Sequence, residues 1–154
     1  MSLGDYANGF IHEWLGDTAE INSGGDIIIN SGSINNIGAD INAGANLALS
    51  TTTGEINIIA QTLRNRDAIS KSKYKNISDS TTNHGSTLTA GSNLILSSIL
   101  DINIIGSDII AAGAGKIESL AGNINIANAI IIINGIDPFK ISDKLTSGVI
   151  PFII

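Results

Sequence analysis

The chain has 154 residues, enough for one domain, and its 43% apolar residues argue against disorder, which requires low hydrophobicity. The absence of cysteine excludes disulfides, thiolate metal sites and cysteine nucleophiles. The net charge of −6 disfavours a nucleic-acid partner, because phosphate binding needs a basic surface.

The sequence contains no signal for a membrane or for export. The longest apolar run spans residues 129–133, far below the roughly 18 residues of a spanning helix, so we expect no membrane insertion. Residues 1–6 lack the basic and apolar regions of a signal peptide. We therefore expect either a cytosolic protein or an excised fragment of a longer one, and the repeats described next favour the fragment.

A repeated pattern dominates the chain. Glycines recur at nearly even steps at Gly24, Gly44, Gly91, Gly113 and Gly135, apart from one longer step between the second and the third. An aliphatic residue stands three positions before each: Ile21, Ile41, Leu88, Ile110 and Ile132. A second pattern alternates Ile with Asn in residues 55–58, 101–104 and 123–126. A period of about 20 residues is too short for two helices and indicates a coil of short strands, in which successive turns (rungs) stack in parallel.

Residues 1–18 lie outside the repeat. They contain Tyr6, Phe10, His12 and Trp14, the only tryptophan. Because solenoids need their open ends covered, we expect a buried aromatic cluster that caps the first rung, or a remnant of an upstream segment.

Residues 19–137 are predicted to form about five rungs of about 20–22 residues. The side chains expected inside the first two rungs are Ile21, Ile27, Ile29, Ile34, Ile37, Ile41, Leu47, Leu49, Ile56 and Ile58. Asn57, Asn103 and Asn125 should then point outward and stack as an amide ladder. In the fourth copy the glycine frame places Lys116 inside, and the phase is regained only if one residue is inserted so that Ile117 points inward.

Residues 61–85 interrupt the coil with a basic excursion that holds five of the eight basic residues. Its arms, residues 62–70 and 74–82, fit a hairpin, and its Ser-Lys-Ser-Lys sequence also fits a disordered loop. We expect this excursion to contact a partner through Arg64, Arg66, Lys71, Lys73, Tyr74 and Lys75. The alternative is a merely solvated charged loop.

Residues 138–154 form an apolar tail without a pattern. Pro138 and Lys140 fall where inward aliphatic residues belong, so the coil should stop at residue 137 and the tail should cap it.

The sequence suggests no catalytic, cofactor or metal site, and we expect no enzymatic activity. His12 and His84 lie in different segments, and Asp26, Asp101, Asp108 and Asp137 are interpreted as turn residues because the calcium-binding β-roll nonapeptide is absent. The main alternative is a polysaccharide-cleaving parallel β-helix with paired carboxylates. The sequence offers no basic or aromatic residues beside these acids to support it.

Residues 85–96, 101–108 and 122–128 resemble the haemagglutinin repeats of filamentous haemagglutinin and of contact-dependent growth inhibition exoproteins, and residues 63–66 and 81–85 resemble segments that flank such repeats. The resemblance implies an all-β fold, a right-handed single-stranded parallel β-helix (solenoid), as the shaft of a large adhesin or toxin-carrying protein exported by two-partner secretion. It further implies a secreted or cell-surface location. The implied partners are an outer-membrane transporter, the neighbouring rungs of the parent chain, and a surface protein or glycan on another cell. No secretion or toxin domain is recognisable here.

Overall fold

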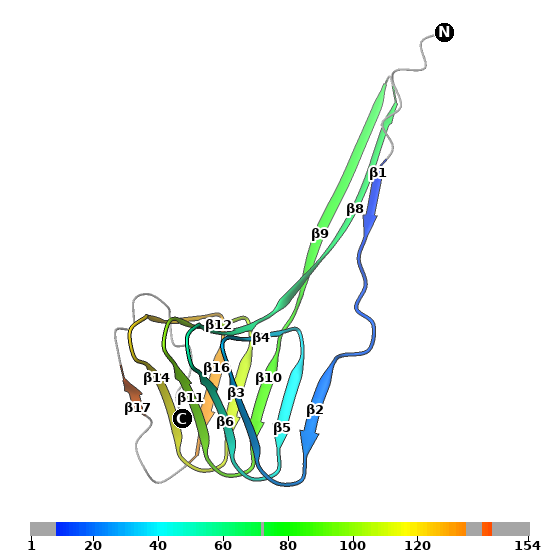
Figure 1. Cartoon of the computed structure of the whole chain (residues 1–154). Helices are drawn as coiled ribbons and strands as arrows, with labels where there is room; N and C mark the ends of the chain where they lie inside the picture. The colour runs from blue at the N-terminus through cyan, green and yellow to red at the C-terminus, as the bar shows by residue number, and fades with distance from the viewer. Residues whose placement is uncertain (1–8, 72, 135–139, 143–154) are drawn as a thin grey trace. The chain divides into compact units, whose positions relative to one another are not determined.

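The computed structural model describes residues 9–71, 73–134 and 140–142 (Figure 1). These residues contain strands and no helix. They divide into two units: a coil unit, residues 18–61, 85–134 and 140–142, and a hairpin unit, residues 9–17 and 62–84 without residue 72. Each unit is described separately below.

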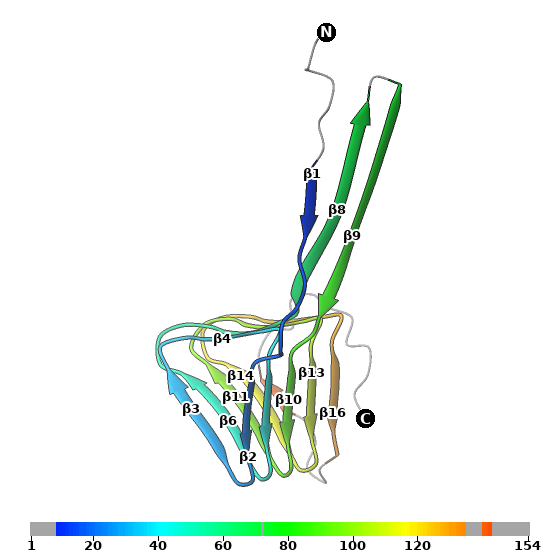
Figure 2. The same cartoon turned by 90° about the vertical axis from the view of Figure 1, so that its right-hand side faces the viewer.

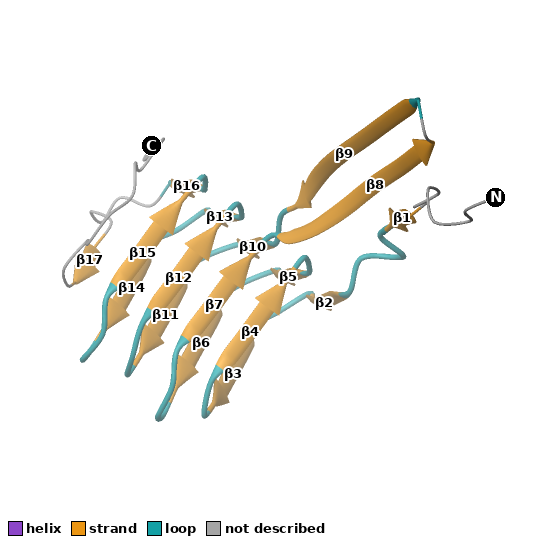
Figure 3. Ribbon diagram, turned by 90° about the horizontal axis from the view of Figure 1, so that it is seen from above, coloured by secondary structure: helices purple, strands orange, loops and turns teal. Residues whose placement is uncertain are grey.

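The coil unit is a solenoid of three parallel sheets, and each of the first four rungs contributes one strand to each sheet (Figure 3). Sheet 1 contains β2 (Glu20–Ser23), β5 (Asp40–Ala43), β10 (Thr87–Ala90), β13 (Asp108–Ala111) and β16 (Ile130–Ile133). Sheet 2 contains β3 (Ile27–Ser31), β6 (Leu47–Thr51), β11 (Leu94–Ser98), β14 (Gly115–Ser119) and β17 (Lys140–Ser142). Sheet 3 contains β4 (Ile34–Ile37), β7 (Ile56–Ile59), β12 (Ile102–Ile105) and β15 (Ile124–Ala127). The predicted parallel β-solenoid of about five rungs is confirmed.

The core consists of columns of inward-facing aliphatic side chains that stack from rung to rung. Alternate residues of a strand point to opposite faces, so in-register stacking places like on like. Leu88 pairs with Ile41 and Ile109, and Leu96 with Leu49 and Ile117. The predicted inward residues that are buried are Ile27, Ile34, Ile41, Leu47, Leu49, Ile56 and Ile58. Ile29 is partly buried against them.

Two predicted inward residues differ from expectation. Ile21 stacks in register on Ile41 but is 50% exposed, because the described residues place no strand on the outer side of its sheet. The inward prediction for Ile37 is wrong: its side chain is 53% exposed, and Asn36 takes the inward position opposite Ile58. Asn36 is only 7% exposed, and its Nδ2 donates to the carbonyl of Ala39 at 2.8 Å, which satisfies the buried amide.

The glycine frame also fails by one position in the fourth rung. Ile109, not Ile110, pairs with Leu88, and Ile131, not Ile132, follows it in the core. The expected inward position of Ile117 is confirmed. Ile117 stacks on Leu96, and Ile124 stacks on Ile102. The sequence separation of the second pair is one residue longer than that of the first pair. The additional residue therefore falls in the turn between β14 and β15.

The coil continues past residue 137, where we expected it to stop. Strand β17 pairs in parallel with β14, with Ile141 in register with Ile117. Sheet 2 therefore gains a strand on its C-terminal side. The other residues of the predicted 138–154 cap, Pro138 among them, lie outside the described residues, and so does Tyr6.

The hairpin unit is a three-stranded antiparallel sheet in the order β1 (Gly9–His12), β8 (Gln61–Lys71) and β9 (Tyr74–His84) (Figure 2). The excursion is thus a hairpin, as one of our two alternatives predicted. Strand β1 was not expected here. Phe10 and Trp14 are 71% and 80% exposed, and the cap or upstream remnant expected of residues 1–18 stays a prediction.

Candidate partner-contact site

Opposite charges are distributed unequally along the chain. The segments 1–17 and 62–84 contain five basic and five acidic residues, whereas the remainder contains three basic and nine acidic residues. The net charge of −6 therefore lies in residues 18–61 and 85–154. The segments of the hairpin are neutral in sum, which makes the position of each charge along them important.

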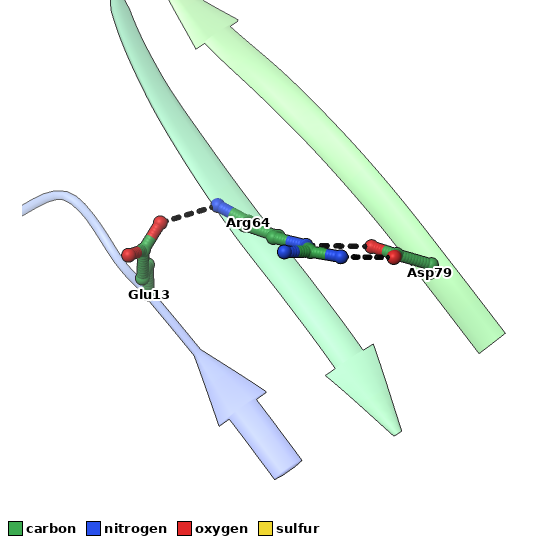
Figure 4. Close-up of polar contacts among 3 residues, drawn as sticks. All are labelled: Glu13, Arg64 and Asp79. Carbon is green, nitrogen blue, oxygen red and sulfur yellow. Dashed lines mark hydrogen bonds and ion pairs between the residues drawn. The ribbon is translucent and has the colours of Figure 1, made fainter. Parts of the chain in front are cut away.

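Arg64, near the start of β8, is held by an acidic partner (Figure 4). Its Nε donates to Asp79 Oδ1 at 3.0 Å and its Nη2 to Asp79 Oδ2 at 2.5 Å, a two-pronged pair. The hydrogen bond from the guanidinium lowers the pKa of Asp79 from its usual value, and the same bond raises the pKa of Arg64. This pair joins β8 to β9.

Glu13, just after β1, secures the other side of Arg64. The backbone N–H of Arg64 donates to Glu13 Oε2 at 2.6 Å, and the N–H of Glu13 donates to the Arg64 carbonyl at 3.1 Å. His12 Nε2 lies 2.8 Å from Asp67 Oδ1. These contacts join β1 to β8, so Arg64 has a structural role rather than being free for a partner.

Arg66 is partly buried. It lies opposite Ile11 in the β1–β8 register, and its Nε is buried without a hydrogen-bond partner among the described residues. The partner-contact role of both arginines stays a prediction: Arg64 is exposed but paired with Asp79, and Arg66 is less accessible. Sequence reasoning missed these contacts because β1 and β8 lie far apart in the chain.

The remaining four predicted contact residues gather where the hairpin turns. We call Lys71, Lys73, Tyr74 and Lys75 the hairpin tip. All four are exposed, and no ion pair joins these lysines to any residue that the structure describes. The sequence from 68 to 78 contains no acidic residue. The tip therefore carries uncompensated positive charge, while the two arginines of β8 are constrained.

The outer face of sheet 3 bears the predicted amide ladder. Asn125 Nδ2 donates to Asn103 Oδ1, Asn103 donates in turn to Asn57, and Asn57 to Asn35, each at 2.7 Å. The predicted ladder is confirmed, and Asn35 of the first rung extends it by one residue. Asn57 also donates to Glu55 at 2.9 Å. The side chains form a continuous polar column that stabilises the stack.

Two acidic residues of the coil bond to the backbone at its turns. Asp26 Oδ1 accepts the backbone N–H of Asn46 at 2.9 Å, and Asp101 Oδ1 accepts that of Asn123 at 2.7 Å. The expected turn position is confirmed for these two, whereas Asp108 begins strand β13 and Asp137 lies outside the described residues. Within residues 9–71, 73–134 and 140–142, no three His, Asp or Glu side chains group as a metal site would require.

The excursion leaves the coil at a corner that normally requires a left-handed backbone. The residues stacked at the turn from sheet 3 to sheet 1 are Gly38, Ala60, Gly106 and Asn128. Their φ angles are +58° for Gly38, +60° for Gly106 and +50° for Asn128. Alanine avoids this region, and at Ala60 the chain departs into β8 instead of turning.

Ser86 restores the coil where the excursion ends. It is 1% exposed and stacks on Ser107, to whose Oγ its N–H donates at 3.1 Å. Its own Oγ accepts the N–H of Ala39 at 3.2 Å and lies 3.1 Å from the Ile59 carbonyl oxygen. Hydrogen bonds within the coil therefore hold Ser86 in place where the chain re-enters the stack.

No helix in the described residues could cross a membrane. Comparison with family models matches residues 68–130 to the hemagglutinin repeat. The matched stretch contains β9 and the third and fourth rungs. Comparisons with curated proteins and with solved structures found no match. The resemblance expected from residues 85–96, 101–108 and 122–128 is thus confirmed, since these residues lie within the matched stretch.

Proposed function

We propose that this chain is a shaft segment of a large secreted bacterial adhesin or contact-dependent inhibition exoprotein, in which the hairpin tip contacts a protein or glycan on another cell. The hemagglutinin repeat supports an adhesin-type segment. The repeat family is structural rather than enzymatic. Export through a dedicated outer-membrane transporter is part of the proposal.

The observation that carries the contact role is the contrast between the tip and the rest of the molecule. Lys71, Lys73 and Lys75 have no acidic partner among the described residues, beside an exposed Tyr74, whereas the coil is acidic. Tyrosine and basic residues are common in contact surfaces, and exposed charge accelerates association with an oppositely charged partner. The partner surface should therefore be anionic.

A polysaccharide-cleaving activity is the second candidate function, and the carboxylate environment disfavours it. A hydrolase needs two carboxyl groups facing one cleft. Asp26 and Asp101 instead accept backbone hydrogen bonds from the adjacent rung. Asp40 Oδ1 likewise accepts the N–H of Thr87 at 3.0 Å.

The experiment is a cell-binding assay with labelled protein. The triple variant Lys71→Ser, Lys73→Ser and Lys75→Ser should lose at least about tenfold in affinity for bacterial or animal cells, and the remaining binding should depend less on salt. The control is Lys116→Ser, which removes a coil lysine paired with Glu118 at 2.7 Å and should leave binding unchanged. Equal binding by the triple variant and the parent would refute the tip as the contact surface.

A further inference from the structure

Strand β9 presents an open edge. It spans Tyr74–His84, and the side chains from Tyr74 to Asn83 are exposed. Strand β8 pairs with one side of it, and the part of the chain that the structure describes places no strand on the other side (Figure 2). The second side of β8, by contrast, is covered by β1. An unpaired edge offers a row of backbone donors and acceptors to another strand.

Of the devices that block edge pairing, β9 has charged side chains but no proline. The strand is 11 residues long, contains neither proline nor glycine, and has no residue with positive φ. The sheet is a single layer, with Ile69 and Ile77 both at least 40% exposed. Small isolated sheets are marginally stable and gain from additional strands.

On one face of β9, the charges are arranged so that the strand complements a second, antiparallel copy of itself. Lys75, Ile77 and Asp79 alternate along the strand and so share a face. Asp79 is already bonded to Arg64 on the neighbouring strand, which fixes this face as the one that bears Arg64. A lysine and an aspartate placed symmetrically around an isoleucine can pair with their own copies across a two-fold axis.

We propose that two copies of this chain associate by antiparallel pairing of their β9 strands around a two-fold axis at Ile77. This register places Ile77 opposite Ile77, and Lys75 of each copy opposite Asp79 of the other. Cross-strand opposite charges stabilise a pair, whereas an axis at Lys75 or at Asp79 would place like charges opposite each other. The product is a continuous six-stranded sheet with a closed, self-complementary interface.

The register is tested with single cysteines, because the chain contains none. In Ile77→Cys the two thiols lie directly opposite, where Cβ atoms are about 4.5–5.5 Å apart and a disulfide is within reach. We expect rapid oxidation to a covalent dimer. Thr81→Cys, on the same face of the same strand, lies beyond residues 74–80, the part of β9 that this register pairs, and should cross-link far more slowly. Equal rates, or faster cross-linking at position 81, would overturn the proposed register.

Sedimentation equilibrium of cysteine-free protein tests the association itself. The parent chain should show a concentration-dependent dimer, and Lys75→Glu should weaken it at least about tenfold, because a glutamate would then oppose Asp79 twice. Lys73→Glu is the matched control: it makes the same change two residues away, in the turn before β9, and should leave dimerisation unchanged. A parent chain that stays monomeric, or equal effects of the two substitutions, would refute the pairing.

Discussion

The coil and the hairpin unit use the same kind of strand but are stabilised in opposite ways. In the coil, alternate residues such as Leu96 and Ile104 are fully buried in columns, and neighbouring rungs supply the cover. In the hairpin, β9 is exposed, and the strands are joined by polar contacts such as Arg64 with Asp79. The regular repeat therefore buries the side chains of the coil, whereas individual side-chain pairs fix the geometry of the hairpin unit.

The strongest way to break this comparison is to place a charge inside the coil. Ile102→Asp should destabilise the coil by about 4 kcal/mol or more, because an unpaired carboxylate would occupy a site with 0% exposure. Chemical denaturation followed by far-ultraviolet circular dichroism measures this.

The same substitution at Ile95 is the control. Ile95 is 44% exposed and lies in register with Lys116, so Ile95→Asp should cost about 1 kcal/mol or less. Similar losses at the two positions would contradict the assignment of inward and outward faces.

A second test concerns the direction of the amide ladder. Asn103 both donates to Asn57 and accepts from Asn125, so Asn103→Asp removes a donor and leaves two oxygens facing each other. A loss of about 1–3 kcal/mol in unfolding free energy is expected. Asn35 only accepts within the ladder, and Asn35→Asp should therefore be milder. An equal loss at the two positions would show that the ladder has no such direction.

A third test removes the excursion. Deleting residues 61–85 joins Ala60 to Ser86, the positions stacked on Gly106 and Ser107, and should leave a folded coil. Ala60 must then take the left-handed corner conformation, so adding Ala60→Gly should stabilise the deletion protein by about 1 kcal/mol.

In the intact chain the effect of that substitution should reverse. Ala60 there has no positive φ, and Ala60→Gly should cost about 0.5–1 kcal/mol. Thermal unfolding of the four proteins gives both signs. A stabilising effect in both backgrounds would refute the corner explanation.

The smallest effect is expected from acid on the Arg64–Asp79 pair. The pKa of Asp79 is lowered by the hydrogen bond from Arg64, so its contribution is complete above the ordinary carboxyl value of 3.8 and is lost as the pH falls through the lower folded value. NMR titration should show the pKa of Asp79 below 3.8 in the parent and near it in Arg64→Gln. Because both side chains are more than a third exposed, the stability change should be slight.

The sequence was informative where one residue type repeats with the rungs. The columns through Leu49, Leu96 and Ile104 followed from alternation, and so did the outward position of Asn103. It was ambiguous where residues 34–37 read Ile-Asn-Asn-Ile, because a two-residue period admits only one of the two isoleucines and a satisfied amide occupied the inward position. It could not reveal the β1–β8 pairing, since nothing local encodes a contact between strands so far apart in sequence.

The amide ladder also implies an order of assembly. At each step from Asn125 to Asn35, the later rung donates and the earlier rung accepts. A chain that folds from its N-terminal end would thus meet a finished row of acceptors each time a new rung arrives, as on a template. The one delay falls between Ala60 and Ser86, where the whole excursion must pass before the next rung can dock. Because this loop must close first, we expect the third rung to dock more slowly than the other rungs, each of which follows its neighbour directly in the sequence.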